Sequence, residues 1–225
     1  MRDHVTADVV NVCFHGVGTP GQGLDAEAAG YFVSRDVFLA VLDELMKYPA
    51  ASLSFDDGYA SDVEIALPAL LERGLSASFF PLAGSLGRPG HVSGAGLRAL
   101  AGAGMTVGSH GMRHRSWRRL DAESGHEEFT LARSMIAEAA GAAVLTAACP
   151  FGAYDRRVLT TLRGQGYAQV FTSDRRRARA GGWLQPRYSV RRDDTPRSVR
   201  DDILAPRPAR ERMRGAAAAR VKAWR

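Results

Sequence analysis

The sequence predicts an α/β fold built on a mainly parallel sheet. Short apolar segments of strand length alternate with segments of helical periodicity along most of the 225 residues, and about seven such pairs are present. Parallel strands need helical crossovers between them, so this alternation favours neither an all-α nor an all-β fold. A barrel and an open sheet both accommodate the pattern. The length and an apolar fraction of 45% fit a single domain.

Apolar segments bounded by glycine, proline or small polar residues are expected to form the strands. They are VVNVCF (9–14), ASLSF (51–55), SASFFPL (76–82), MTVGS (105–109), AVLTAAC (143–149), YAQVFTS (167–173) and PRYSV (186–190). Each is followed by residues that favour a turn or the start of a helix, which is the order expected of repeated βα units.

The helical segments carry their own start and stop residues. Expected N-caps are Ser34, Ser93, Asp121, Asp155 and Thr195, the last followed by proline at the first helical position. Gly74 and Gly104 are expected to end helices. Ser61 and Glu64 have the spacing of a capping box, and Pro68 predicts that the helix after them kinks or restarts.

The N-terminal residues, the lengths of the apolar segments and the two cysteines indicate the cellular compartment. The N-terminal MRDHVTADVV lacks the uninterrupted apolar core of a secretory signal, and no segment approaches the roughly 20 apolar residues of a membrane span. We therefore expect a cytoplasmic protein without a transmembrane segment. Cys13 and Cys149 lie in apolar segments, and we expect buried thiols rather than a disulfide or a zinc site.

The net charge of +6 comes almost wholly from arginine. Basic residues concentrate in DRRRAR (174–179) and in the C-terminal RPARERMRGAAAARVKAWR (207–225). Nucleic acid or another anionic surface is one interpretation, but no aromatic residues interleave with these charges, so a solvated loop and helix are preferred. We expect a catalytic domain over residues 1–205 and a basic helical tail over 206–225 that is an appendage to the fold.

Two adjacent aspartates follow the second predicted strand, in LSFDDGYASD (53–62). Neighbouring side chains of a strand point to opposite faces. Asp56 and Asp57 can therefore share one site only if the strand ends at the pair and the chain turns there, which Gly58 permits. An isolated Asp-Asp-Gly is more often a helix cap and a solvated loop, so a functional interpretation needs support from other residues.

A second polar motif follows the fourth predicted strand, in MTVGSHGMRHRSW (105–117). His110 and His114 are four residues apart, a separation that places two imidazoles on one face of a helical turn. This motif and the aspartate pair both fall at carboxyl ends of predicted parallel strands, where sites gather in such folds. Two histidines and one carboxylate leave room for water or substrate, as catalytic zinc and non-haem iron sites do.

A third motif, ACPFGAYD (148–155), follows the fifth predicted strand. Pro150 and Gly152 constrain the turn, so the backbone N–H of Phe151 can face the site. The alternative is an ordinary loop with Phe151 in the core and Asp155 as a helix cap.

In this order, the three motifs resemble those of the polysaccharide deacetylase family, also called the NodB-homology or carbohydrate esterase family 4 domain. The resemblance covers residues 9–204. It implies a distorted (β/α)7 barrel in a single domain, which is consistent with the count of predicted units.

The resemblance also implies roles for the motif residues. Asp56 would be the general base, and Asp57, His110 and His114 would bind a divalent metal, with Zn²⁺ expected and Co²⁺ or Ni²⁺ as alternatives. The Phe151 N–H would help to hold the oxyanion. Candidate substrate-binding residues are Tyr59, Pro150, Gly152 and Arg187.

Several positions depart from the family pattern. Ala148 stands where members often carry an arginine that orients the base, and Arg187 in QPRYSV is a candidate replacement. Many members have a late leucine-x-x-histidine motif whose histidine protonates the leaving amine, but no histidine follows His126. His15, after the first strand, is the candidate acid, because relatives acting on exported poly-N-acetylglucosamine have a histidine there. A purely structural His15 is equally consistent with the sequence.

The resulting hypothesis is a metal-dependent carbohydrate deacetylase that removes an N-acetyl group from an amino sugar or glycoconjugate. Alternatives are a relative that hydrolyses another linear amide and a degenerate member that binds carbohydrate without turnover. A basic nucleic-acid-binding protein is less favoured, and the sequence identifies no protein partner.

Overall fold

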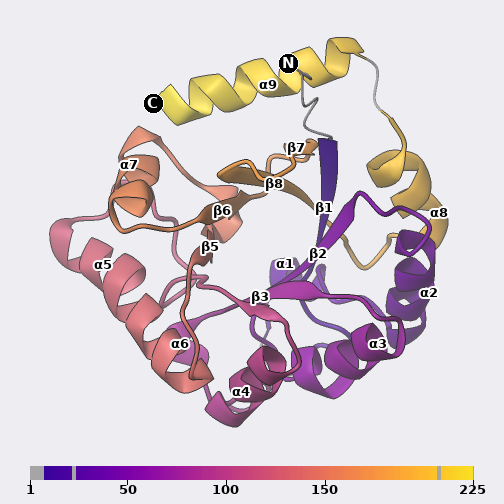
Figure 1. Cartoon of the computed structure of the whole chain (residues 1–225), viewed down its shortest axis with the longest axis horizontal. Coiled ribbons are helices and arrows are strands. Elements are labelled where there is room, and N and C mark those ends of the chain that lie inside the picture. The colour runs from indigo at the N-terminus through magenta and orange to yellow at the C-terminus, as the bar shows by residue number, and fades with distance from the viewer. Residues whose placement is uncertain (1–7, 22–23, 207–208, 225) are drawn as a thin grey trace, which may run out of the picture.

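The chain forms a nearly closed barrel of seven parallel strands inside a ring of helices (Figure 1). A computed structural model describes residues 8–21, 24–206 and 209–224. The parallel strands are β1 Asp8–Phe14, β2 Ala51–Asp57, β3 Ala77–Pro81, β4 Thr106–Val107, β5 Thr146–Ala148, β6 Gln169–Thr172 and β8 Leu184–Ser189. Their order is β4-β3-β2-β1-β8-β6-β5, and the short β7 Ala178–Arg179 pairs antiparallel with β1. All seven predicted strands are present.

The two outer strands of this order, β4 and β5, approach each other through Ser109. Its N–H donates to Thr146 O at 3.0 Å, and its carbonyl accepts the Ala148 N–H at 2.9 Å. This contact brings the ends of β4 and β5 together, so the prediction of a barrel is confirmed and the open sheet is excluded.

Helices follow the strands as predicted. The α-helices are α1 Ala26–Ala29, α2 Arg35–Leu45, α3 Leu67–Glu72, α4 Gly94–Gly102, α5 Ala122–His126, α6 Ala132–Ala140, α7 Arg156–Gly164, α8 Pro196–Ser198 and α9 Ala209–Trp224. Three π-helical turns, η1 Asp62–Ala66, η3 Glu127–Leu131 and η5 Val199–Leu204, and two 3₁₀ turns, η2 Ala83–Ser85 and η4 Pro150–Gly152, complete the set among the described residues. The short α1 has no counterpart in the predicted elements.

Most of the predicted helix boundaries are correct. The expected N-cap side chains each accept a backbone N–H from the first turn: Ser34, Ser93, Asp121, Asp155 and Thr195. Pro68 lies at the start of α3, directly after η1, because a residue without an N–H cannot continue the helical ladder. Gly74 and Gly104 follow α3 and α4 with positive φ.

The predicted capping box at Ser61 and Glu64 is wrong. Ser61 has helical backbone angles and makes no cap, because the helical turn has already begun with the Asp62 N–H donating to Tyr59 O at 3.0 Å. The Ser61 hydroxyl instead accepts the Val17 N–H at 3.1 Å, which ties the loop after β1 to the loop after β2.

The strand register assigns the two faces of the barrel wall. Phe14, Phe55 and Phe79 lie side by side on β1, β2 and β3, and the Phe55 and Phe79 rings stack with centroids 4.7 Å apart. This face packs against Phe38 of α2. Because strand side chains alternate, Asp56 points to the opposite face, which is the barrel interior.

The C-terminal segment is helical over residues 209–224, and the division into a domain over 1–205 and a tail over 206–225 stays a prediction. Figure 1 shows α9 outside the barrel strands, with its C-terminal end next to α7. It contacts α7, and Ala223 packs against the core. Residues 207, 208 and 225 of the predicted tail, and residues 1–7 at the N-terminus, lie outside the described ranges.

Two further expectations concern burial and membranes. Cys13 and Cys149 are buried free thiols, as predicted. Among the described residues, no helix combines the length and apolar character that a bilayer crossing requires.

Candidate active site

The aspartate pair lies where β2 ends and the chain turns. Asp57 is the last residue of β2 and has a φ of 72°, and Gly58 follows with 68°. A Cβ on Gly58 would lie 2.7 Å from the Pro81 Cβ, so this position also excludes a side chain. Because the turn begins at Asp57, both carboxylates reach the same histidine: His110 Nε2 is 3.8 Å from Asp56 Oδ2 and 3.5 Å from Asp57 Oδ1.

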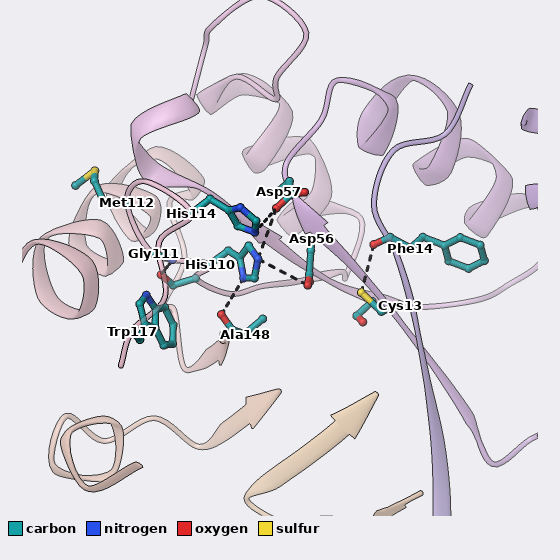
Figure 2. Close-up of polar contacts among 12 residues, drawn as sticks. Cys13, Phe14, Asp56, Asp57, His110, Gly111, Met112, His114, Trp117 and Ala148 are labelled. Atoms are coloured by element: carbon teal, nitrogen blue, oxygen red, sulfur yellow. Dashed lines mark hydrogen bonds and ion pairs between the residues drawn. The ribbon is translucent and has the colours of Figure 1, made fainter. Parts of the chain in front are cut away.

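Asp57, His110 and His114 converge on one point (Figure 2). Their candidate ligand atoms all lie within 4.8 Å of one another, and His114 Nε2 is 3.6 Å from Asp57 Oδ1. His110 Nδ1 lies 2.8 Å from Ala148 O and donates to it, which leaves the Nε2 lone pair directed at Asp57.

The three residues fit a divalent cation. Asp57 Oδ1 is buried and has no hydrogen-bond partner among the described residues. A buried carboxylate oxygen without a partner is costly, and a cation at this point would satisfy it. Two imidazole nitrogens and one carboxylate oxygen are the donor set of many catalytic zinc sites, which leave a coordination position open.

The predicted helical turn under the two histidines is wrong. Residues 110–114 form an irregular loop in which Gly111 has a φ of 83° and His114 a φ of 51°. A helical turn is excluded because two residues of this segment adopt left-handed backbone angles. The imidazoles converge through the loop conformation and not through helical periodicity.

Glu128 holds this loop in place, although no motif in the sequence indicated it. Its buried carboxylate accepts the N–H groups of Met112 at 2.8 Å and Arg113 at 3.2 Å, and the Trp117 Nε1–H at 3.2 Å. A Cβ on Gly111 would lie 2.2 Å from Glu128 Oε2. Glu128 lies in the helical segment that begins after Asp121, but its partners, two backbone N–H groups and the Trp117 indole, are contacts that no sequence pattern reveals.

Arg187 orients Asp56. Its Nη1 and Nη2 donate to the two carboxylate oxygens at 2.6 Å each, and Nη1 also donates to Ser54 Oγ at 3.1 Å. Burial alone would raise the pKa of Asp56, but the Arg187 guanidinium, with His110 and His15, holds that pKa well below its usual range. Asp56 is therefore ionised at neutral pH.

The contacts of Arg187 separate its two predicted roles. As the candidate replacement for the missing arginine, it is placed as expected. As a substrate-binding residue it is misplaced, because its side chain is wholly buried in the barrel interior behind Asp56.

His15 lies beside the aspartate pair at the end of β1. Its ring packs on Tyr31, with centroids 4.6 Å apart, and one of its nitrogens is within 4.8 Å of an Asp56 oxygen. Burial lowers the pKa of His15, and the charges of Asp57 and Asp56 offset only part of that effect. His15 is therefore neutral at neutral pH, with a buried Nδ1 that has no partner among the described residues.

The third motif forms the tight turn η4. Phe151 is 59% exposed with a φ of 57°, so the alternative that placed it in the core is wrong. Its ring lies 4.4 Å from that of His114, and no described residue accepts its N–H. Pro150 and Gly152 are buried and shape the turn, and their role in substrate binding stays a prediction.

Most of the candidate residues line one cavity of about 360 Å³. It is lined by seven of the ten candidate residues: His15, Asp56, Asp57, Tyr59, His110, His114 and Phe151. The wall also includes residues that no motif in the sequence indicated: Asp25, Glu27, Tyr31, Leu82, His91, Ser173 and Ser189. Several of these belong to α1 and to loops whose positions no motif indicated.

Comparison with known proteins agrees with this geometry. A sequence model of the polysaccharide deacetylase family matches residues 45–170, more than half of the chain. The chain belongs to the polysaccharide deacetylase family. The matched range includes the aspartate pair, both histidines and the third motif, whereas His15 and Arg187 lie outside it.

Individual relatives of this deacetylase family are distant. YxkH of Bacillus subtilis, provisionally described as a polysaccharide deacetylase, is 23% identical over 122 residues, which are 54% of this chain and 44% of YxkH. The chain thus spans less than half of that relative.

Solved structures share the fold. The Streptococcus pyogenes deacetylase PplD, in complex with acetate, has a TM-score of 0.76 at 16% identity and covers 89% of this chain and all of its own. IcaB from Ammonifex degensii has a TM-score of 0.69 at 24% identity, with 85% of this chain and 93% of IcaB covered.

Proposed function

We propose that this polysaccharide deacetylase family member is a metal-dependent hydrolase that removes the N-acetyl group from an amino sugar or glycoconjugate. One observation carries the proposal: the Asp57, His110 and His114 ligand atoms converge in a cavity beside a second, ionised carboxylate, Asp56. Amide hydrolysis needs both a polarised carbonyl and a base. The acetate bound to PplD, which shares the fold, supports the choice of acyl group.

Asp57, His110 and His114 would hold the metal ion. Zn²⁺ is the proposed ion, and Co²⁺ or Ni²⁺ suit the same donors. When bound, such an ion supplies Lewis acidity and lowers the pKa of a coordinated water to about 7.

The remaining site residues transfer protons or stabilise the negative charge that develops during the reaction. Asp56, kept ionised by Arg187, accepts a proton from the attacking water. The Phe151 N–H donates to the oxygen that becomes negatively charged in the tetrahedral intermediate. His15 delivers a proton to the departing nitrogen. Because His15 starts neutral, it must first gain that proton, and Asp56, which has an oxygen within 4.8 Å of a His15 nitrogen, passes on the proton that it takes from the water.

Acetate release from a panel of N-acetyl sugars and glycoconjugates tests this function. The chelated protein is expected to be inactive, and one equivalent of Zn²⁺ or Co²⁺ is expected to restore turnover. Release of another acyl group would favour the alternative of a different linear amide. Saturable sugar binding without hydrolysis under every metal would identify the degenerate carbohydrate-binding member instead.

His15→Ala is expected to keep its metal but to lose about 10²-fold in kcat on N-acetyl substrates, because the leaving amine lacks its proton donor. On an activated acetate ester, whose leaving group departs without a proton, the loss is expected to be much smaller. Parallel kinetics on the two substrates, with metal analysis, measure the difference. Equal losses on both would assign His15 a structural role, and His91→Ala, on the same cavity wall, is the matched control.

A further inference from the structure

The last turn of α9 reaches the third motif. Lys222 Nζ donates to Gly152 O at 2.6 Å and to Asp174 Oδ1 at 2.8 Å, and it lies 4.3 Å from the centroid of the Tyr154 ring. The lysine side chain is 34% exposed and the aspartate side chain only 10%. The ion pair is thus sheltered, and it joins the C-terminal helix to the turn that carries Phe151.

This turn needs external support. Phe151 and Gly152 have successive left-handed φ values of 57° and 59°. A non-glycine residue in that region is strained, and it persists only where the surroundings hold it. Inside the turn, the Gly152 N–H donates to Cys149 O at 2.8 Å. On its inner side, a Cβ on Gly152 would lie 2.7 Å from Ser173 N, so the turn is pressed against the end of β6.

Asp174 links this support to the strand ends. Its Oδ2 accepts from the Tyr154 hydroxyl at 2.7 Å and from Thr172 Oγ1 at 2.8 Å, while Oδ1 accepts from Lys222. The carboxylate therefore joins the loop after β5, the end of β6 and the C-terminal helix. Removing Lys222 would leave Asp174 Oδ1 and Gly152 O without the donor they now share.

We infer that Lys222 is a positioning residue that fixes the η4 turn and, with it, the direction of the Phe151 N–H. The C-terminal helix is then a support of the active site, although it lies outside the range matched by the family model. The consequence for turnover rests on the proposed oxyanion role of the Phe151 N–H, whereas the consequence for the turn does not.

The test compares Lys222→Met with Arg220→Met in the full chain. Methionine keeps an unbranched apolar stem and removes the donor, and Arg220 is an exposed arginine of the same helix. Amide spectra of ¹⁵N-phenylalanine-labelled protein, with the Phe151 signal assigned from Phe151→Leu, report the turn directly. Lys222→Met is expected to shift or broaden that signal, and Arg220→Met is expected to leave it in place.

Kinetics provide the second readout. Lys222→Met is expected to lower kcat about fivefold with KM and metal content nearly unchanged, because only interactions in the transition state weaken. Lys222→Arg is expected to recover part of the loss. A moved Phe151 signal with unchanged kcat would support the positioning and refute the oxyanion role. An unmoved signal in Lys222→Met would overturn the inference.

Discussion

Asp56→Asn is expected to keep its bound metal and to lose about 10²–10⁴-fold in kcat, because the water loses its proton acceptor. The amide still accepts one hydrogen bond from Arg187, so the orientation of the side chain survives in part. Asp57→Asn is expected to lose both metal and activity, because Asp57 Oδ1 lies 3.5 Å from His110 Nε2 and 3.6 Å from His114 Nε2, whereas Asp56 forms such a contact with His110 alone of these two histidines. The two neighbouring, equally conservative substitutions therefore separate the base from the ligand.

Metal content per chain and kcat on the best N-acetyl substrate measure this difference. Asp56→Asn also removes the counter-charge of a buried arginine and is expected to lower the unfolding temperature. Both variants should therefore be assayed well below their thermal unfolding midpoints. Metal loss in Asp56→Asn would place that carboxylate on the ion. Activity close to that of the parent in Asp56→Asn would refute the base assignment.

The strands and most helix boundaries could be predicted because their causes are local. Apolar segments of strand length and side chains such as Ser34 and Asp155, which cap a helix beginning at the next residue, are visible in the sequence. The positions of Asp56 and His110 at strand ends follow from the same patterns. The parallel order of the strands then brings them to one rim.

Other features depend on contacts between segments that are distant in sequence. Whether Arg187 faces the barrel interior depends on the register of β8 against β1, which pairs it with Asn11, and no local pattern sets that register. The loop that carries His114 takes its shape from Glu128, and the C-terminal helix is positioned through Lys222. From its composition, α9 is a basic segment, because one lysine that faces the barrel does not change the average charge or apolar content of the segment.

Arg187→Met is expected to lower the free energy of unfolding by about 3–5 kcal/mol at neutral pH, because it leaves the buried Asp56 carboxylate without its counter-charge. In the parent, the folded-state pKa of Asp56 lies below the unfolded value, so the pair stabilises the fold above that unfolded pKa and the stabilisation is lost as pH falls through the folded value. In the variant, only His110 and His15 still oppose the effect of burial, and the pKa of Asp56 is expected to rise, so the folded state retains a proton that the unfolded state releases.

The pH dependence of the destabilisation therefore identifies its cause. Because protonation removes the unpaired charge, the stability lost in Arg187→Met should be smaller at pH 5 than at pH 8, and Asp56→Asn combined with Arg187→Met should recover a large part of it at pH 8. The parent, Asp56→Asn, Arg187→Met and the double variant form a double-mutant cycle. Urea unfolding of these four proteins without metal, at both pH values, measures it. The lowered pKa values of His15 and His110 make every member less stable at the lower pH, but that effect is largely shared and mostly cancels between the four. The losses in free energy of unfolding could instead add in the double variant and be equal at pH 5 and pH 8. Arg187 would then act by filling the barrel interior and not by holding the charge of Asp56.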